Sequence, residues 1–280
     1  MCLIWGSTWL VIREGLRDLP PFSSAAMRFA LAAVLMAGVA HLLARREGGG
    51  RPPRWLVLVQ GGVNFALSYG IVYWAEQVLP SSLTSILWGV YPLIMAVCAH
   101  FGLPGERLRG VHAAGFLLGF AGVVLLCATD VREIGPDAVR ASLVLLVSPL
   151  VVAIATTLIK RHGGGASSLL LNRDGLFVGA ALLAATAFAT ERGAPFAWTG
   201  RAVLSVVYLA VVGTVLTFGL YFWLLRHAPA YKLSVIPYVT PVVAVLLGAL
   251  VGGESIGPTT IAAMLMILVG VLFVTRPAGR

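Results

Sequence analysis

Charged residues are scarce in this sequence. Asp, Glu, Lys and Arg make up 11% of its 280 residues, while 59% of the residues are hydrophobic. A soluble protein carries about 25% charged residues, so this composition could not cover the surface of a soluble domain. A lipid bilayer must therefore replace water around most of the exterior. At about 20 residues per span, the chain predicts about ten transmembrane helices and no separate soluble domain.

Motifs of enzymes and of nucleic-acid-binding proteins are also missing. The three cysteines, Cys2, Cys98 and Cys127, lie in apolar runs without the spacing of a metal or redox site, so we expect them to pack as small hydrophobic residues. No Walker motif is present, so ATP is not expected to drive the protein directly. The net charge of +9 favours anionic lipid headgroups as partners, and not nucleic acid. We expect no cofactor and no metal.

Apolar runs alternate with short segments rich in Gly, Pro and charge. The runs cover residues 1–12, 21–44, 55–79, 83–103, 108–128, 138–159, 167–190, 202–225, 233–251 and 256–275. The first run would extend only about 18 Å as a helix, against a hydrocarbon core of about 30 Å. We therefore expect the native gene to encode further apolar residues before Met1. The pattern predicts an all-α, polytopic membrane protein.

Lysine and arginine are unequally divided between alternate loops. The richer set comprises Arg45, Arg46, Arg51, Arg54, Arg107, Arg109, Lys160, Arg161, Arg226, Lys232, Arg276 and Arg280. The other loops hold half as many, namely Arg13, Arg17, Arg132, Arg140, Arg192 and Arg201. Because cytoplasmic loops carry the excess of basic residues, the richer set is predicted to be cytoplasmic, together with both termini.

The two halves of the sequence resemble each other. Gly70, Trp74, Pro80, Ser85 and Pro92 recur at one constant offset as Gly219, Trp223, Pro229, Ser234 and Pro241. Gly-Glu followed by Gly-Val occurs at 105–106 and 122–123, and again at 253–254 and 270–271. With an odd number of spans per half, about five, the second half must enter the membrane inverted, which is typical of secondary transporters. The sequence predicts repeats at 1–132 and 133–280.

Several motifs carry a family resemblance. Residues 5–9 read Trp-Gly-Ser-Thr-Trp, Arg28-Phe29 lies in the second span, and the Pro, Gly-Glu and Gly-Val series occurs in both halves. The sequence resembles, over essentially its whole length, EamA-type bacterial members of the drug/metabolite transporter superfamily. The resemblance implies ten helices in two inverted five-helix halves. It also implies a place in the bacterial cytoplasmic (inner) membrane and efflux of small metabolites, such as amino acids. At 172–174 the chain reads Asn-Arg-Asp where the family usually carries a Gln.

Polar, aromatic and proline residues within the spans are the candidates for a substrate pathway. They are Trp5, Arg28, Asn64, Tyr69, Trp88, Tyr91, Pro92, Tyr238 and Pro241. A charge inside lipid costs at least about 2.5 kcal/mol, so Arg28 is expected to face a cavity and a substrate carboxylate. Its alternative role is structural, through a backbone carbonyl or the headgroups. Pro92 and Pro241 are expected to interrupt their helices, either for binding or for packing alone.

Four other charged residues are expected to be structural. Glu106 and Glu254 follow glycines at helix junctions, where the helix dipole favours a carboxylate cap, and proton coupling is the alternative role. The neighbours Arg173 and Asp174 are expected to point in different directions and not to pair with each other.

Two other function classes are left open beside a secondary transporter. A membrane-embedded prenyltransferase would need Asp-rich motifs for Mg²⁺, whereas the aspartates here are scattered. A serine protease would need a serine facing a histidine, and no nucleophile motif surrounds any serine in the spans. A passive channel is the other class, and the inverted repeat is only weak evidence against it. The expected partners are a small-molecule substrate and membrane lipids, and no oligomeric state is assigned.

Overall fold

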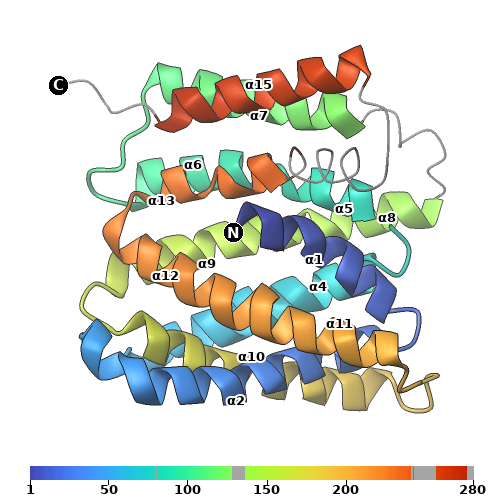
Figure 1. The fold of residues 1–280 in the computed structure, drawn as a ribbon. Helices are drawn as coiled ribbons and strands as arrows, with labels where there is room; N and C mark the ends of the chain where they lie inside the picture. Colours follow the sequence, from blue (N-terminus) through green and yellow to red (C-terminus); the bar gives the residue numbers. More distant parts are fainter. Residues whose placement is uncertain (80, 128–135, 241, 243–256, 276–280) are drawn as a thin grey trace.

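The structure is a computed structural model that describes residues 1–79, 81–127, 136–240, 242 and 257–275. These residues form helices joined by short loops, and the described ranges contain no strand (Figure 1). The elements are α1 (Cys2–Gly15), α2 (Pro21–Glu47), α3 (Arg54–Leu58), η1 (Val59–Leu67), α4 (Ser68–Ala75), α5 (Ser81–Trp88), α6 (Tyr91–Gly102), α7 (Gly110–Cys127), α8 (Pro136–Leu145), α9 (Val147–His162), α10 (Ser168–Thr190), α11 (Gly200–Ala210), η2 (Val211–Leu216), α12 (Thr217–His227), α13 (Ala230–Leu233) and α15 (Pro258–Thr275).

Several elements join into rods of membrane-spanning length. Among the described residues, five rods are long and apolar enough to cross a bilayer: Pro21–Glu47, Arg54–Ala75, Pro136–His162, Ser168–Thr190 and Gly200–His227. Shorter apolar helices cover Tyr91–Gly102, Gly110–Leu125 and Pro258–Val274. Helices suit a bilayer because they satisfy their backbone hydrogen bonds internally. The predicted all-α polytopic class is therefore observed over the described residues, and most of the predicted run 233–251 lies outside them.

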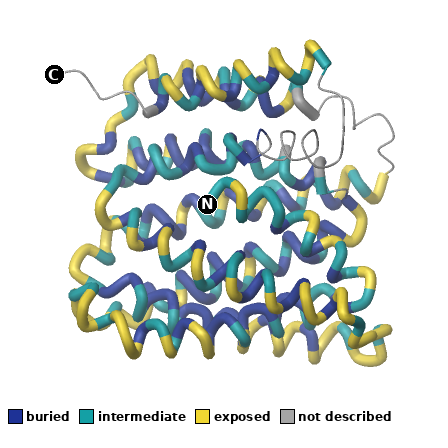
Figure 2. The backbone as a smooth tube through the Cα atoms, in the orientation of Figure 1, coloured by how far each residue is buried: buried dark blue, intermediate teal, exposed yellow. Residues whose placement is uncertain are grey.

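The exterior is apolar, and several polar and charged side chains are buried in a mainly apolar interior. Phe101 and Leu42 are 83% and 71% exposed, whereas Arg28, Gln60 and Asn172 are buried. Figure 2 shows the exposed positions on the outward faces of the helices and in the loops, while buried positions follow the faces where helices meet. A soluble protein exposes far fewer large apolar side chains, so this surface fits contact with lipid chains.

The loops gather at two opposite ends of the bundle (Figure 1). We call one the basic end; it holds the connections at 48–53, 103–109, 163–167 and 228–229, on the left of the figure. The acidic end, on the right, holds the connections at 16–20 and 191–199. This arrangement agrees with the alternation of loops on which the predicted orientation depends.

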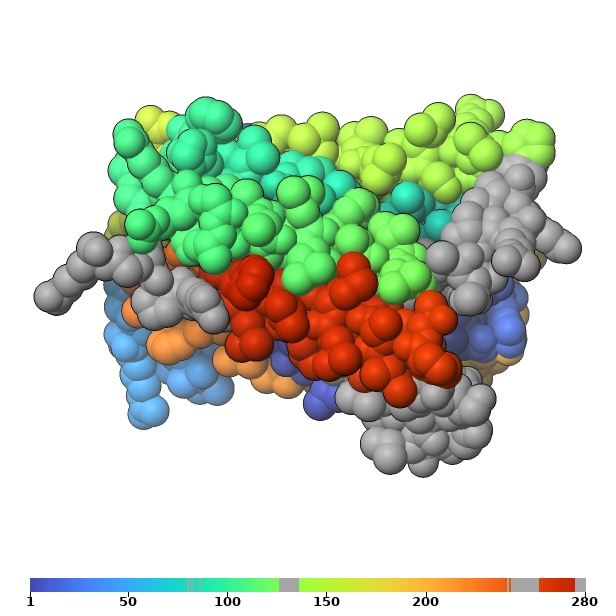
Figure 3. All heavy atoms as spheres, turned by 90° about the horizontal axis from the view of Figure 1, so that it is seen from above, coloured from blue at the N-terminus to red at the C-terminus, as the bar shows by residue number. Residues whose placement is uncertain are grey.

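Helices α7 and α15 pack side by side along one face of the molecule (Figure 3). A Cβ atom added to Gly270 would lie 2.6 Å from both the carbonyl oxygen of Gly115 and the amide nitrogen of Gly119. A Cβ atom added to Gly122 would lie 2.8 Å from the carbonyl oxygen of Ala263. Glycine is required at this crossing because the two backbones touch. The two contacts correspond under the sequence repeat, with the helices exchanged.

Candidate functional site

An internal cavity is lined by residues of α1, η1, α4, α5, α6, α9 and α12 and by the helical residues 236–240. The space open to the centre of a water-sized molecule is about 90 Å³, enough for several waters or a small organic molecule. Its aromatic wall comprises Trp5, Trp9, Tyr69, Trp88, Tyr91, Phe218, Tyr221 and Phe222. Its polar groups are Thr8, Asn64, Ser68, Ser85, Thr156 and Thr240. Among the described lining residues, none carries a formal charge.

The cavity brings together part of the set proposed from sequence. Five of those residues line it: Trp5, Asn64, Tyr69, Trp88 and Tyr91. Arg28, Pro92 and Tyr238 are buried nearby but do not belong to the described lining. Pro241 lies outside the described residues.

A break between α5 and α6 places two aromatic residues on the cavity. Helix α5 ends at Trp88 and α6 begins at Tyr91, with Pro92 in its first turn. Proline lacks a backbone N–H, so it fits the first turn, where that donor would lack a helical partner. The rings of Trp88 and Tyr91 are 5.7 Å apart, and the Tyr91 hydroxyl lies 3.1 Å from that of Tyr221.

Two rods widen into π-helical segments beside the cavity. The segment η1 carries Asn64 into the lining, and Ser68 and Tyr69 follow in α4. The segment η2 lies in the second half of the chain. The hydroxyls of Thr214, in η2, and of Thr217, the first residue of α12, donate to carbonyls five residues earlier, at 2.8 and 2.5 Å. Single π turns within α-helices are frequent at functional sites.

Arg28 lies behind the cavity wall and is 1% exposed. Its guanidinium donates to the hydroxyl of Thr214 at 2.9 Å, to the carbonyl of Gly213 at 3.3 Å and to the hydroxyl of Tyr73 at 3.4 Å. Its carbon Cζ lies 4.8 Å from the ring centre of Tyr69, within range of a cation–π contact. Arg28 therefore contacts the cavity-lining residue Tyr69, and its hydrogen-bond partners among the described residues are neutral.

Three buried polar atoms of the lining have no hydrogen-bond partner within the described ranges. They are Nε1 of Trp5, Nε1 of Trp88 and Oδ1 of Asn64. Buried polar atoms are normally paired, so such atoms around a cavity indicate a ligand or water. Two donors and one acceptor are thus available in an otherwise aromatic space.

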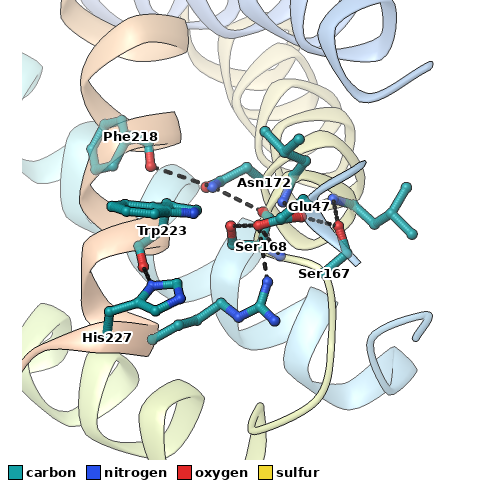
Figure 4. Close-up of polar contacts among 10 residues, drawn as sticks. Glu47, Ser167, Ser168, Asn172, Phe218, Trp223 and His227 are labelled. Atoms are coloured by element: carbon teal, nitrogen blue, oxygen red, sulfur yellow. Dashed lines mark hydrogen bonds and ion pairs between the residues drawn. The ribbon is translucent and has the colours of Figure 1, made fainter. Parts of the chain in front are cut away.

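A chain of amide side chains leads from the cavity toward the basic end. The Nδ2 group of Asn64 donates to Oε1 of Gln60 at 2.7 Å, and Nε2 of Gln60 donates to Oδ1 of Asn172 at 3.0 Å. Nδ2 of Asn172 donates to the carbonyls of Ser168 at 3.0 Å and Phe218 at 3.4 Å (Figure 4). The chain joins η1, α10 and α12 through buried side chains.

A clamp closes the basic end next to this chain. Glu47, the last residue of α2, accepts hydrogen bonds from the hydroxyls of Ser167 and Ser168 and from the backbone N–H of Ser168 (Figure 4). Its carboxylate also lies 3.1 Å from Nη1 of Arg226. We call Glu47, Ser167, Ser168 and Arg226 the basic-end clamp. It ties α2 to the start of α10 and the end of α12.

A second clamp closes the acidic end. Asp18 accepts hydrogen bonds from Nη2 of Arg201 at 2.8 Å and from the hydroxyl of Thr199. These hydrogen bonds lower the pKa of Asp18 from 3.8 to about 2, that of Arg201 contributing most. Glu191 accepts from the backbone N–H and the hydroxyl of Ser23 at 2.8 and 2.6 Å. We call Asp18, Thr199 and Arg201 the acidic-end clamp.

One of the charged pairs expected to be structural differs from its sequence-based interpretation. Nε of Arg173 lies 2.7 Å from Oδ1 of Asp174, so the expectation that these neighbours would not pair is wrong. Partly exposed side chains can bend toward each other where two rigid ones could not. Glu106 accepts from the backbone N–H of Ala230 at 2.7 Å and lies 3.1 Å from Nζ of Lys160, which is a structural role. Glu254 lies outside the described residues.

Sequence reasoning omitted several residues of the cavity and its surroundings. Gln60 shares a helical face with Asn64 and Ser68, at four-residue spacing, and this polar stripe in an apolar run was a usable signal. Phe218 and Thr156 had no such signal, because apolar and small hydroxyl residues are ordinary in any span. Tyr238 lies beside the lining residue Pro237 but points its hydroxyl away from the lining, to the carbonyl of Phe116 at 2.9 Å.

Comparison with known proteins gives one consistent family. The EamA-like transporter family matches residues 1–128 and 139–276. Relatives include the uncharacterized transporter YoaV of Bacillus subtilis, 27% identical over 99% of this chain and 95% of YoaV. The uncharacterized inner membrane transporter YedA of Escherichia coli K12 is 29% identical over 98% of this chain and 87% of YedA. A crystal structure with 23% sequence identity superposes with a TM-score of 0.80, covering 98% and 94% of the two chains, which shows the shared fold.

Proposed function

The chain belongs to the EamA-like transporter family, and from this premise we propose that it is a secondary transporter that exports small metabolites, such as amino acids or related compounds. The observation that carries the proposal is the aromatic cavity, in which three buried polar atoms have no partner among the described residues. The family consists of transporters and not of enzymes. By analogy with YedA, we place the protein in the bacterial cytoplasmic membrane.

The chemistry of the cavity suits an amino acid with an apolar side chain. The indole N–H groups of Trp5 and Trp88 can donate to a carboxylate, since both are buried and lack a partner in the described part of the chain. Oδ1 of Asn64 can accept from an ammonium group, and the surrounding ring faces attract a cation. The apolar side chain would then replace water against aromatic walls. In this proposal Arg28 supports the site through Tyr69 instead of binding the carboxylate itself.

We propose that the two halves, 1–132 and 133–280, are five-helix repeats inverted with respect to each other. Two features support this: the exchanged glycine contacts between α7 and α15, and the π segments η1 and η2, which occur at corresponding positions of the sequence repeat. Inverted halves would allow the cavity to open alternately at either end. The basic end and both termini are assigned to the cytoplasm by the excess of basic residues.

Transport by purified protein in proteoliposomes tests this function. Radiolabelled leucine and phenylalanine should enter vesicles saturably, and preloaded unlabelled substrate should accelerate the uptake. Trp88→Phe retains the ring and removes the N–H donor, so it should raise KM about tenfold or more, the cost of one hydrogen bond to a charged group. Trp223→Phe, at a side chain that is 45% exposed on the outer surface, is the matched control. If no amino acid gave saturable uptake, the proposed substrate class would be rejected. Uptake that rises linearly with concentration and shows no exchange would indicate a channel.

A further inference from the structure

Glu76 is a buried acid to which the transport site gives no role. It directly follows α4, is 3% exposed, and both of its carboxylate oxygens lack a hydrogen-bond partner among the residues that the structure describes. A charge without a partner is strongly disfavoured in such a place. The burial of both carboxylate oxygens therefore favours the neutral acid over the carboxylate in this conformation.

The ionisable groups around Glu76 come from several elements. Arg13 at the end of α1 and Arg28 in α2 both favour ionisation through their charge, yet neither forms an ion pair with Glu76 in the described structure. Tyr73 lies one turn earlier on the same helix. Helix α8, which packs on α4, carries Asp137 and Arg140 at exposed positions. The segment η1 has no ionisable residue, and those of α9 occupy its last turn, toward the basic end.

Glu76 is also close to the cavity along the chain and through Arg28. Val72, one helical turn before Glu76, lines the cavity, and so does Ile12, next to Arg13. Arg28 contacts Tyr69 of the cavity wall, and its charge also influences Glu76. The buried charge of Arg28 has only neutral hydrogen-bond partners in the described structure, so ionisation of Glu76 would supply the missing counter-charge.

We propose that Glu76 binds and releases the proton that couples export to the proton gradient, an inference that rests on the proposed function. The carboxylate takes one proton from water when the acidic end is open, and the resulting acid can be buried as the cavity closes. When the cavity opens to the basic end, the acid returns the proton to water and the carboxylate turns to Arg28. No electron moves, and one proton crosses per cycle. The new attraction between the Glu76 carboxylate and Arg28 would draw the guanidinium away from Tyr69. The loss of that contact would alter the substrate site.

Infrared titration of the purified protein tests the proton site without any substrate. We expect the carbonyl band of a protonated carboxylic acid at neutral pH in the wild type and in Glu14→Gln, and its loss in Glu76→Gln. Glu14 is the matched control because it lies at the same end of the molecule, where it pairs with Arg17 at 3.0 Å. Glu76→Gln mimics the neutral acid and should elute as folded protein. Absence of the band in the wild type, or its persistence in Glu76→Gln, overturns the proton site and leaves the transport function untouched.

A transport measurement tests the coupling itself. In proteoliposomes, a pH gradient should drive accumulation of radiolabelled phenylalanine by the wild type above the level reached without a gradient. Glu76→Gln should lose this accumulation completely but keep exchange of labelled for unlabelled phenylalanine. Equal gradient-driven accumulation by both proteins overturns the coupling role. If the wild type shows neither exchange nor accumulation, the proposed transport function is wrong. The infrared titration then decides the proton site by itself.

Discussion

At the scale of single residues, Arg28 shows what a sequence can and cannot reveal. A charge within an apolar run predicts burial against a cavity or a partner, because lipid does not tolerate it. The partners themselves come from Thr214, Gly213, Tyr73 and Tyr69, two of them far away in the chain. No local pattern specifies these contacts. The sequence alone therefore could not distinguish an Arg28 that binds the substrate carboxylate from one that contacts Tyr69 behind the cavity wall.

Substitution of Arg28 should separate its charge from its geometry. Arg28→Lys retains the charge but loses the planar group that spans three acceptors, so we expect at least a tenfold fall in transport and a loss of about 1–3 kcal/mol of stability. Arg28→Ala should abolish transport while the protein still inserts. Arg192→Ala is the control, because Arg192 stacks on Phe188 at 4.2 Å on the surface. Transport assays and thermal unfolding in detergent measure both effects. Normal transport by Arg28→Ala would refute the role of this residue.

At the scale of helices, hydropathy was sufficient for some features and not for others. The predicted runs agree with the observed rods within a few residues, because burial in lipid selects long apolar stretches. The expected interruption at Pro92 occurs, since proline marks it locally. The π segments η1 and η2 were not foreseen. Their extra residue per turn depends on tertiary partners, such as Arg28 on η2, and leaves no mark in hydropathy.

The contact of α7 with α15 gives a prediction about helix packing. Gly270→Ala places a Cβ atom 2.6 Å from backbone atoms of α7, so the helices must separate, at a cost of about 1–3 kcal/mol. Gly38→Ala is the matched control, because a Cβ atom there meets nothing within 4 Å and alanine favours the helix. The free energy of unfolding, measured by denaturation in detergent, should therefore fall in Gly270→Ala and rise in Gly38→Ala. A stability loss in Gly38→Ala equal to that in Gly270→Ala would show that the crossing is not tight.

At the scale of the whole molecule, the cavity lies between the two clamps, and the acidic-end clamp keeps its charges over a wide pH range. The pKa of Asp18 is lowered to about 2, chiefly by the hydrogen bond from Arg201. A lowered folded-state pKa stabilises the clamp above its unfolded value of 3.8, and this contribution is lost only as the pH falls toward 2. The acidic-end clamp thus stays ionised across the physiological range, from about pH 5 to about pH 8. A transport response to pH within that range must come from another group, for which Glu76 is our proposal.

Weakening either clamp should open the cavity at that end. Glu47→Gln removes the charge that holds Arg226 and the α10 start, whereas Asp18→Asn removes the charge that holds Arg201. With Thr8→Cys as the single cysteine in the cavity lining, a membrane-impermeant thiol reagent reports access from each side. We expect Glu47→Gln to speed labelling in inverted vesicles, which expose the cytoplasmic face, and Asp18→Asn to speed it in right-side-out vesicles. Because each clamp ties different helices across one end only, a variant that increased labelling equally from both sides would contradict alternating access and indicate a continuous pore.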